Sequence, residues 1–357
     1  MPTQKSASTD VSVIVPCRNE IREIRAFLDC ILRQELGELE MEVLIADGMS
    51  DDGTRAVLDE FRTGFENLRV LDNPEKIVST GLNRAIREAS GEIIIRMDAH
   101  TLYAADYVRT CVEVLNETGA GNVGGPALTR AEGYIAEAIA HGFHAPFASG
   151  GAKYRDPKYE GSVDTVSYGC WRKSTLELIG LFDEHMVRGE DDDLNRRLAS
   201  HGGIVWQSPR IVSWYRPRDG LRALFWQHLQ YGFWKVPIVW KHRGRPTWRN
   251  FAPVSCLAVA AILLSCAVVA DATGSASLRN SVLVALLALA CLYLAGSLGS
   301  AFVVAKRNGW KFLPFMPIVF GVFHVSYALG FSLGLAFPPR PWDQPNPIQR
   351  ALTAITR

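Results

Sequence analysis

Short apolar runs alternate with longer amphipathic stretches over the first hundred residues. Four runs have the length and the β-branched composition of buried strands: 11–15, 41–46, 68–71 and 92–97. Apolar residues recur at helical spacing in the stretches between them: 20–34, from Asp52 onward, and 76–89. Strands that alternate with helices of about 10–15 residues indicate βαβ units. The pattern therefore predicts an α/β domain with a mostly parallel sheet.

The last third of the chain is dominated by three long runs without Asp, Glu, Lys or Arg: Phe251–Ala270, Ser281–Ala305 and Phe312–Phe337. A helix needs about 20 apolar residues to cross a hydrocarbon core of about 30 Å, and each run is that long. The runs predict a helical membrane domain over 251–337. Pro314, Pro317 and His324 leave open whether the third segment is straight, kinked or re-entrant.

Lysine and arginine are distributed unevenly around these runs. Five precede the first run, between Lys235 and Arg249, and three lie between the second and third. The link between the first and second runs has only Arg279. The positive-inside rule therefore predicts a multi-pass protein of the inner (cytoplasmic) membrane, with residues 1–250 in the cytoplasm. The side of the tail stays open, because Arg340 and its neighbours make it basic.

Composition narrows the function further. The 357 residues have a formal net charge of +1, which argues against nucleic acid as the main partner. The seven cysteines form no C-x-x-C pair, so reduced structural thiols are expected rather than a zinc site. Residues 1–10 are polar and lack an apolar core segment, so no signal peptide is expected.

Polar residues follow three of the predicted strands. Pro16 to Glu20 come after the first, Asp47 after the second, and Asp98 and His100 after the fourth. Ligands of parallel sheets bind beyond the carboxyl ends of the strands. Asp98 and His100 lie two residues apart, on one face of a strand, so both could reach a single ion. An imidazole suits Mn²⁺ better than Mg²⁺, although His100 could also be a plain loop residue.

Four stretches, in this order, resemble glycosyltransferase family 2: VSVIVPCRNE, VLIADGMSDDGT, GLNRAIREASGEIIIRMDAH and GEDDDLNRRL. The resemblance covers about residues 10 to 215. It implies a Rossmann-like GT-A domain and an inverting transfer from a nucleotide sugar. The His of the third stretch and the apolar C-terminal part are similar to membrane-attached glucosyltransferases of succinoglycan-type exopolysaccharide assembly.

The resemblance also implies roles for residues at matching positions. Donor binding would fall to five residues, with Asp47 on the uracil: Pro16, Glu20, Asp47, Asn83 and Asp98. A divalent metal, Mn²⁺ or Mg²⁺, would bind Asp98 and His100. The alternative for Asp47 is an ordinary turn aspartate.

In the family, the general base belongs to a Glu-Asp pair at this position. In the run GEDDD this pair corresponds to Glu190 and Asp191. Asp191 would take the proton of the attacking hydroxyl, and Glu190 would orient it or contact the acceptor. An inverting transfer needs one such base. Asp193 is expected to cap the following helix, and acids at a helix N-terminus are also favoured by the helix dipole alone.

Acceptor contacts are expected from Trp171, which precedes the acidic run, and from Gln227 and Tyr231. The last two stand where membrane synthases of the family carry Q-x-x-R-W, but the Arg and Trp are absent. Residues 141–155 are Gly-rich and could form a mobile acceptor-side loop or a plain surface loop.

The predicted organisation has five parts: a disordered N-terminus (1–9), a catalytic domain (10–219), interfacial amphipathic helices (220–250), about three transmembrane helices (251–337) and a tail (338–357). The predicted function is metal-dependent transfer from a UDP-sugar, UDP-glucose first, to a lipid-linked saccharide in polysaccharide or glycoconjugate assembly. Membrane lipids and other assembly proteins are expected partners. Two alternatives remain: a processive synthase that exports its polymer, and a non-catalytic membrane-anchored nucleotide-sugar-binding protein.

Overall fold

The predicted strands lie side by side in one half of a larger sheet. The computed structural model describes residues 9–242, 248–341 and 343–354. The N-terminal segment expected to be disordered, 1–9, therefore lies outside the described residues except for Thr9. Four parallel strands follow the order β3-β2-β1-β4: β1 (Val11–Cys17), β2 (Met41–Asp47), β3 (Leu68–Asp72) and β4 (Ile93–Arg96). Three helices connect them: α1 (Ile24–Leu32), α2 (Thr54–Arg62) and α3 (Val78–Glu88). The α/β prediction is confirmed.

The first helix begins four residues later than the pattern indicates. Residues 20–23 form a turn instead, because the loop before α2 offers side-chain acceptors to its backbone. The Glu20 N–H donates to Thr54 Oγ1 at 2.9 Å, and the Ile21 N–H donates to Asp52 at 3.1 Å. These bonds join the loops that follow β1 and β2 at the edge where ligands are expected.

Beyond β4 the sheet becomes mixed. β9 runs antiparallel between β4 and β6, and β10 is parallel to β6. The bounds of these strands and of the short edge strand are: β6 (Asn122–Gly125), β8 (Gly161–Ser162), β9 (Ser167–Arg172) and β10 (Val205–Gln207). A small second sheet contains β5 (Thr101–Tyr103), β7 (Leu128–Thr129) and β11 (Ser213–Tyr215). The remaining helices of this domain include α4 (Tyr107–Thr118), α7 (Lys173–Ile179) and α8 (Glu190–Ser200).

Both faces of the main sheet are covered. Val13 and Val15 belong to the apolar core on one face, and Ile14 belongs to the core on the other. Parallel strands buried on both faces read as continuous apolar runs, as 11–15 does. Burying each such side chain contributes about 1.5–3 kcal/mol, so the sheet holds its strand ends in fixed positions.

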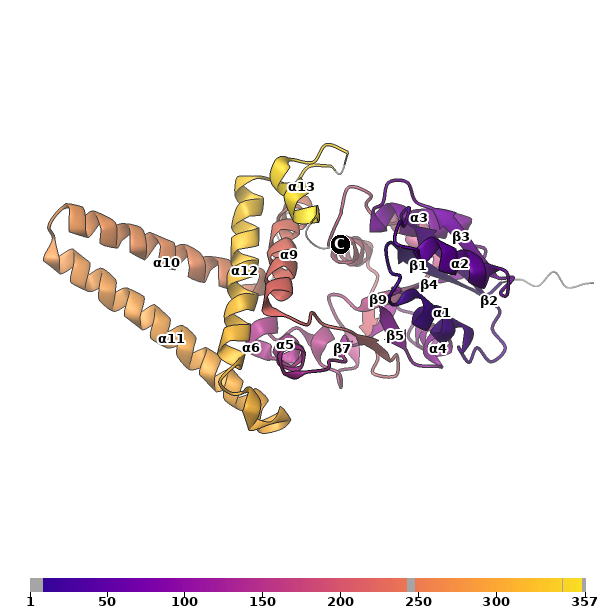
Figure 1. Ribbon diagram of the computed structural model, residues 1–357, viewed down its shortest axis with the longest axis horizontal. Coiled ribbons are helices and arrows are strands. Elements are labelled where there is room, and N and C mark those ends of the chain that lie inside the picture. The colour runs from indigo at the N-terminus through magenta and orange to yellow at the C-terminus, as the bar shows by residue number, and fades with distance from the viewer. Residues whose placement is uncertain (1–8, 243–247, 342, 355–357) are drawn as a thin grey trace, which may run out of the picture.

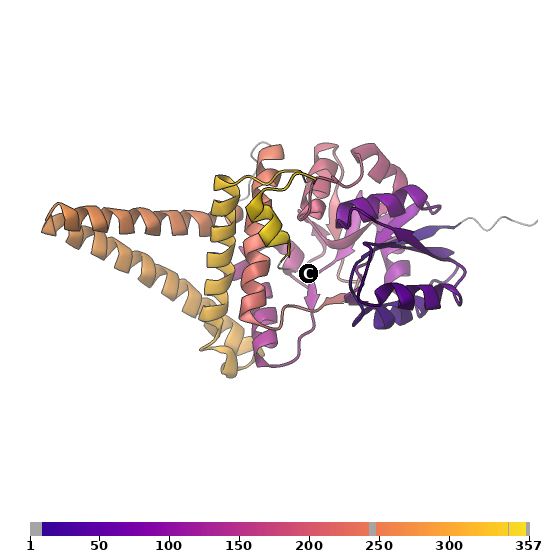
Figure 2. The same cartoon turned by 45° about the horizontal axis from the view of Figure 1, so that its top comes forward.

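After the α/β domain the described residues form five α-helices: α9 (Leu221–Lys241), α10 (Trp248–Ala272), α11 (Ala276–Asn308), α12 (Met316–Ala336) and α13 (Pro347–Ala354). Within the described residues, α10, α11 and α12 are long and apolar enough to cross a membrane. α10 and α11 form a hairpin that projects away from the rest of the protein (Figures 1 and 2). The protein covers none of the most apolar window of α10, and a large exposed apolar surface of this kind needs lipid or a partner.

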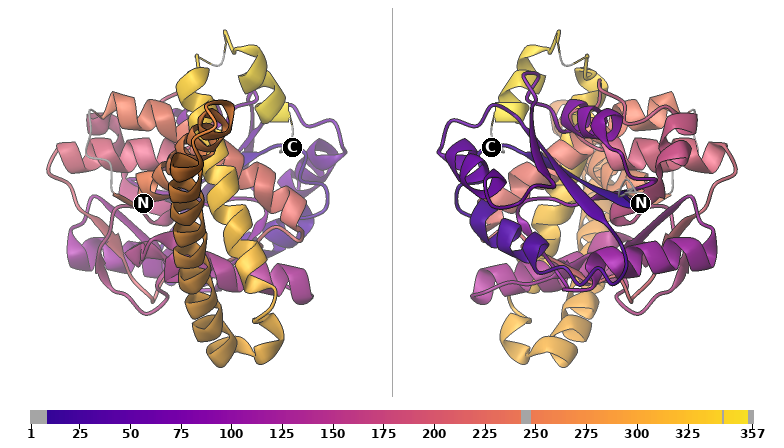
Figure 3. Two further views of the ribbon diagram at one scale, coloured as in Figure 1. Left: turned by 90° about the vertical axis from the view of Figure 1, so that its left-hand side faces the viewer. Right: turned by 90° about the vertical axis from the view of Figure 1, so that its right-hand side faces the viewer.

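α12 lies against α9 and joins the helical part to the α/β domain. A Cβ atom at Gly232 of α9 would meet the Tyr327 carbonyl oxygen, and one at Gly330 of α12 would meet that of Leu229. The two helices therefore cross closely where glycines permit it. Viewed from its two ends, the molecule presents the α10–α11 hairpin at one end and the β1–β3 part of the sheet at the other (Figure 3).

The third apolar run is not kinked by its prolines. Pro314 lies before α12, and Pro317 lies in its first turn, where a missing N–H costs nothing. Of the alternatives left open for the third run, a kink caused by Pro314 or Pro317 is therefore wrong. Proline does lie inside two other helices, as Pro237 in α9 and Pro253 in α10.

Candidate active site

A buried arginine joins the two acidic motifs. Arg96, the last residue of β4, is 5% exposed. Its Nε and Nη2 donate to Asp98 at 2.9 and 3.3 Å. Its Nη1 donates to Glu190 at 3.1 Å and to Asp191 at 2.6 Å. One guanidinium thus holds three carboxylates, and both Asp98 and Asp191 bond to it.

Local geometry explains this meeting. Arg96 and Asp98 are two residues apart, so strand alternation places both on one face of the sheet edge. α8 begins after Gly189, whose φ of 79° lies in the left-handed region that favours glycine. Glu190 and Asp191 then occupy the first turn, where the helix dipole favours acids. The chain therefore delivers two acids to the end of β4 without a side-chain cap.

Asp191 is suited to exchange a proton near neutral pH. Burial raises its pKa, the positive charge of Arg96 opposes the rise, and the negative charges of Glu190 and Asp98 add to it, giving about 7. About a third of the side chain remains exposed, at 34%. A carboxylate that is accessible and half-neutralised at pH 7 has the properties of a general base.

Of the residues expected to bind the donor, Asp47 is held by its own loop. It ends β2, is 2% exposed, and accepts from Ser50 Oγ at 2.6 Å and from Arg55 Nη1 at 3.3 Å. Pro16 lies on the adjacent strand, in register with Ala46. The turn alternative accounts for part of the bonding of Asp47, and the uracil contacts of Pro16 and Asp47 stay predictions.

His100 and Glu20 link the ends of the first and fourth strands. The His100 Nδ1 lies 3.3 Å from Glu20 Oε1. Burial lowers the pKa of His100, but the Glu20 bond and the Asp98 charge outweigh it, so the pKa is raised overall. A carboxylate behind one ring nitrogen is common in metal-binding histidines and leaves Nε2 as the ligand atom.

Asp98 and His100 offer oxygen and nitrogen donors of the kinds that bind divalent ions. In the described parts of the chain, no three His, Cys, Asp or Glu side chains form a group that could hold an ion. Asp98 retains lone pairs beyond those that Arg96 uses, and His100 adds a nitrogen. The remaining ligand positions would have to come from the phosphates of a bound substrate.

Two predicted site residues have structural surroundings. Asn83 is 2% exposed, and its amide donates to the Phe182 carbonyl oxygen at 2.8 Å and accepts from the Phe182 N–H at 2.9 Å. These bonds fasten α3 to the loop before α8, and donor binding by Asn83 stays a prediction. Trp171 is 1% exposed and packs edge-on against Phe182. Acceptor contact by Trp171 is wrong, because β9 is an inner strand whose alternate side chains enter the core.

The other two acids of the run face α9. Asp193 is fully buried and accepts from three basic side chains: Arg197 at 2.9 Å, Lys241 at 2.8 Å and His242 at 2.8 Å. The expected cap is wrong, because the helix has no side-chain capping bond. Asp192 pairs with Lys235 at 2.6 Å. Together these contacts anchor the helical part on α8.

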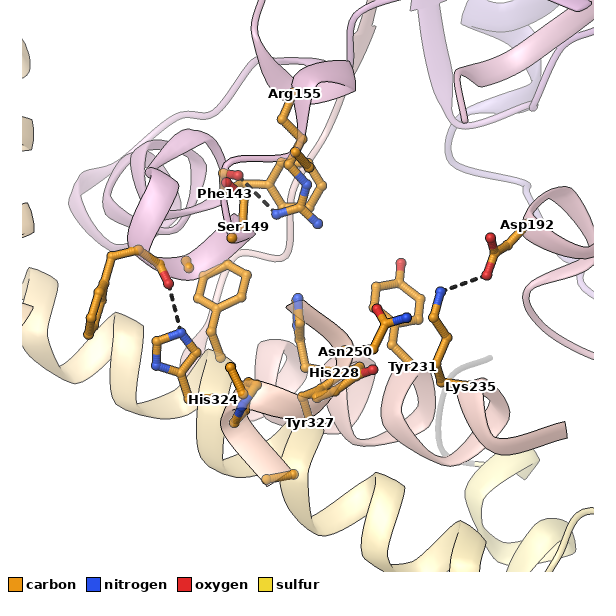
Figure 4. Close-up of a pocket in the computed structure, with 18 of the residues that line it drawn as sticks. Phe143, Ser149, Arg155, Asp192, His228, Tyr231, Lys235, Asn250, His324 and Tyr327 are labelled. Atoms are coloured by element: carbon orange, nitrogen blue, oxygen red, sulfur yellow. Dashed lines mark hydrogen bonds and ion pairs between the residues drawn. The ribbon is translucent and has the colours of Figure 1, made fainter. Parts of the chain in front are cut away.

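A cavity of about 900 Å³ lies between α8, α9 and the apolar helices (Figure 4). Tyr231 lines it, and Gln227 donates to the Tyr231 oxygen at 3.1 Å from outside the lining. Residues 141–155 form another wall. They are not a loop but largely helical: the end of α5 (Tyr134–His144), α6 (Pro146–Ser149) and the 3-10 turn η1 (Lys153–Arg155). The loop prediction is wrong because aromatic side chains of this segment, such as Phe147, pack against α12.

Arg96 and the cavity were not found by sequence reasoning. A signal for Arg96 was present, because a charged residue inside an apolar strand is rarely buried unless it is paired. The cavity had no such signal, since its walls come from segments more than a hundred residues apart.

Comparison with known proteins gives consistent results. Residues 12–168 match the family model described as Glycosyl transferase family 2. The succinoglycan biosynthesis protein ExoA of Rhizobium meliloti is 32% identical over 93% of this chain and 96% of its own length. A dolichyl N-acetyl-alpha-D-glucosaminyl phosphate 3-beta-D-2,3-diacetamido-2,3-dideoxy-beta-D-glucuronosyltransferase of Methanococcus voltae is 28% identical over 67% of this chain and 76% of its own.

A solved structure supports the fold. The mannosyltransferase PcManGT from Pyrobaculum calidifontis, in complex with GDP-Man and Mn²⁺, aligns with a TM-score of 0.56 at 20% identity. The alignment covers 90% of this chain and 86% of that one. At this identity the likeness concerns the fold alone.

Proposed function

Because the chain belongs to glycosyltransferase family 2, we propose that it transfers a sugar from a UDP-sugar, UDP-glucose first, to a lipid-linked saccharide with inversion. The observation that carries the proposal is the Arg96 cluster. It brings Asp98, on the donor side, and Asp191, on the acceptor side, onto one guanidinium. A transferase needs its base near the sugar that the leaving group carries, and Asp98 and Asp191 bond to different nitrogens of the same guanidinium.

Asp191 would perform the proton transfer. The acceptor hydroxyl oxygen attacks the anomeric carbon, and its proton passes to an Asp191 oxygen. The bond between that carbon and the diphosphate oxygen breaks, and its electron pair leaves with the nucleotide. Arg96 engages Asp191 Oδ1, so Oδ2 is the atom offered to the acceptor. Attack from the face opposite the leaving group inverts the anomeric centre.

Asp98 and His100 would hold a divalent cation. When bound, the ion would neutralise the charge that develops on the leaving diphosphate. Its support is the oxygen and nitrogen pair at the end of β4, and the Mn²⁺ recorded with the archaeal mannosyltransferase of the same fold. The raised pKa of His100 also suits a direct contact with the diphosphate.

Metal titration separates these two roles. We expect Mn²⁺ to support at least as much transfer as Mg²⁺, and chelator to abolish it. His100→Ala should weaken the Mn²⁺ dependence if His100 is a ligand, and should leave it unchanged if His100 only contacts phosphate. Full activity in chelator would overturn metal dependence.

A lipid-linked acceptor is supported by the apolar helices beside the site, which would place the reaction at a membrane surface. The donor and acceptor are tested together by incubating the membrane-embedded protein with UDP- and GDP-sugars and membrane lipid extracts. We expect UDP release and a lipid product heavier by one hexose. Release of GDP alone would overturn the UDP assignment.

Product length also tests the processive alternative. Three candidate spans are few for a channel that would carry a polymer, so one added sugar is expected. A long polymer in the same assay would favour the synthase. The non-catalytic alternative has no support from the comparisons, because the curated relatives reported above are biosynthetic proteins by name.

A further inference from the structure

The cavity beside α8 has two chemically different ends. Its wall near α8 contains charged side chains, and its far wall is built from the helices that could cross a membrane. On α10, four small or apolar lining residues follow one another at helical spacing: Pro253, Cys256, Leu257 and Ala260. The cavity therefore runs from the edge of the candidate active site to a surface expected to meet lipid.

The charged end favours an anion. Its described lining includes four cationic and two acidic side chains, an excess of two positive charges: Arg155, Arg188, Arg196, Lys235, Asp164 and Asp192. Figure 4 shows Arg155 and Lys235 reaching in from different segments, η1 and α9. Arg155 also stacks on Phe143 at 3.8 Å, which holds its guanidinium in a fixed orientation.

Two buried polar groups in the wall are without a hydrogen-bond partner among the described residues. They are the Asn250 amide nitrogen at the start of α10 and the Tyr327 hydroxyl of α12. Both residues are labelled in Figure 4. Buried polar groups are rarely left unpaired in native proteins, so these two indicate a polar occupant that the cavity receives.

The cavity is separate from the donor residues. Asp47, Asp98 and His100 do not belong to its lining, whereas Gly189 and Asp192, on either side of Asp191 in sequence, do. Successive helix residues point about 100° apart, so Asp191 can face the sugar while Asp192 faces the cavity. The cavity thus lies on the acceptor side of the base.

We propose that this cavity binds the phosphate-bearing head of a lipid, with its chain against α10 and α12 and its attached sugar directed toward Asp191. The proposal rests on the proposed function and names the site of its acceptor. Lys235 and Arg155 contact the phosphate, and Asn250 and Tyr327 donate to its oxygens or to the first sugar. The volume of about 900 Å³ is at the upper end of small-ligand sites.

The test uses the full chain in phosphatidylcholine nanodiscs, with UDP present and empty nanodiscs as the blank. Calorimetry compares three probes: farnesyl diphosphate, inorganic diphosphate and neutral dodecyl maltoside. We expect farnesyl diphosphate to bind at least about tenfold more tightly than either, because only it meets both ends of the cavity. Equal binding of inorganic diphosphate would mean a free-phosphate site and would overturn the lipid assignment. Equal binding of the maltoside would overturn the anionic one.

Variants locate the binding. Lys235→Gln and Arg155→Gln should each weaken farnesyl diphosphate binding by roughly tenfold, the loss typical of one charge-assisted contact. Cys256→Trp should block the apolar end. The matched controls are Lys311→Gln, which removes an exposed lysine paired with Glu137, and Ile262→Trp, on an exposed position of α10. Neither control residue lines the cavity, and both variants should bind as the wild type does.

Nucleotide-sugar binding, measured on the same preparations, keeps the two proposals apart and reports folding. If cavity variants bind nucleotide sugars and farnesyl diphosphate as the wild type does, the cavity assignment is wrong and the proposed function stands. If the wild type binds farnesyl diphosphate through these residues but binds no nucleotide sugar, the donor chemistry is wrong and the cavity assignment is supported.

Discussion

Four consecutive acids open α8, and they divide between two regions of the molecule. Glu190 and Asp191 meet Arg96 at the sheet edge, where one guanidinium is shared with Asp98. Asp193, two residues after Asp191, is fully buried toward α9 and pairs with Arg197, Lys241 and His242, of which Lys241 also pairs with Asp183. The sheet edge has more acids than bases, and the α9 side has the reverse.

This difference in charge balance predicts different roles for the two regions. At the sheet edge, burial and neighbouring acids raise the pKa of Asp191 to about 7, so its protonation can change during a reaction. For Asp192, burial alone would raise the pKa, but Lys235 and Arg196 outweigh it and lower the pKa overall. That carboxylate stays charged and structural. The ratio of acids to bases around each side chain decides its role, although the four residues are almost identical in type.

Asp191→Asn is expected to have the largest effect, a loss of transfer activity. The amide cannot accept the acceptor proton, so we expect transfer to fall by about 10²–10⁴-fold. Nucleotide binding should stay within about twofold, since the donor residues are untouched. Transfer assays and nucleotide titration measure the two effects. An equal loss of both would show that Asp191 supports the donor site instead.

Arg96→Met removes the shared cation. Three carboxylates would then face one another, so the free energy of unfolding should fall by about 3 kcal/mol or more. The pKa of Asp191 should rise further, because the only opposing effect is lost, and the pH–rate profile of the surviving protein should move to higher pH. Urea unfolding and pH-dependent transfer rates are the measurements.

The control for this variant is Arg210→Met. Arg210 also bridges two carboxylates, Glu113 at 2.9 Å and Glu117 at 2.5 Å, but all three side chains are exposed. Exposed pairs contribute about 0–1 kcal/mol, so little change is expected. If both variants lost the same free energy of unfolding, the Arg96 cluster would contribute no more to stability than an exposed ion pair does.

Asp193→Asn tests whether the ion pairs of Asp193 stabilise the packing of α9 on α8. It removes the buried carboxylate that pairs with Arg197, Lys241 and His242, although Lys241 keeps Asp183. The free energy of unfolding should fall by about 2 kcal/mol. Transfer by the folded fraction should change much less than in Asp191→Asn, because Asp193 has no contact with the Arg96 cluster among the described residues. A thermal melt and a turnover number per folded molecule check this. Wild-type stability would contradict the anchoring role.

The wild-type pH dependence is expected to be the smallest effect. Asp191 must be deprotonated to act as base, and its pKa is raised, so transfer should decline as the pH falls through about 7. One pH unit below that value the rate should be about tenfold lower than its high-pH plateau. Asp192→Asn should leave this profile unchanged. A rate independent of pH from 5.5 to 8 would contradict Asp191 as the titrating group.

The α/β half was predictable from the sequence because its strands are buried on both faces and its helices are amphipathic. Those patterns depend on local spacing alone. The same holds for α10, α11 and α12, whose apolar runs exceed the length of a membrane span. The family's motifs assigned roles to Asp98 and Asp191 but did not predict that Arg96 joins them.

Predictions failed where a role depends on distant partners. Trp171 was expected at the acceptor, but β9 enters the sheet between β4 and β6, a pairing that strand spacing cannot reveal. Residues 141–155 looked like a loop because of their glycines, and packing of Phe147 on α12 makes most of the segment helical. The split of the four acids was likewise invisible, since it depends on Arg96 and on the end of α9.

The central claim is inverting transfer from a nucleotide sugar by a single base. Proton NMR of the reaction, with the α-linked nucleotide sugar that the donor screen selects, tests it most directly. We expect the α-anomeric signal of the donor to disappear as a β-anomeric signal of the lipid product appears, and Asp191→Asn to show neither change. An α-linked product would contradict single-base inversion and require a different arrangement of catalytic groups.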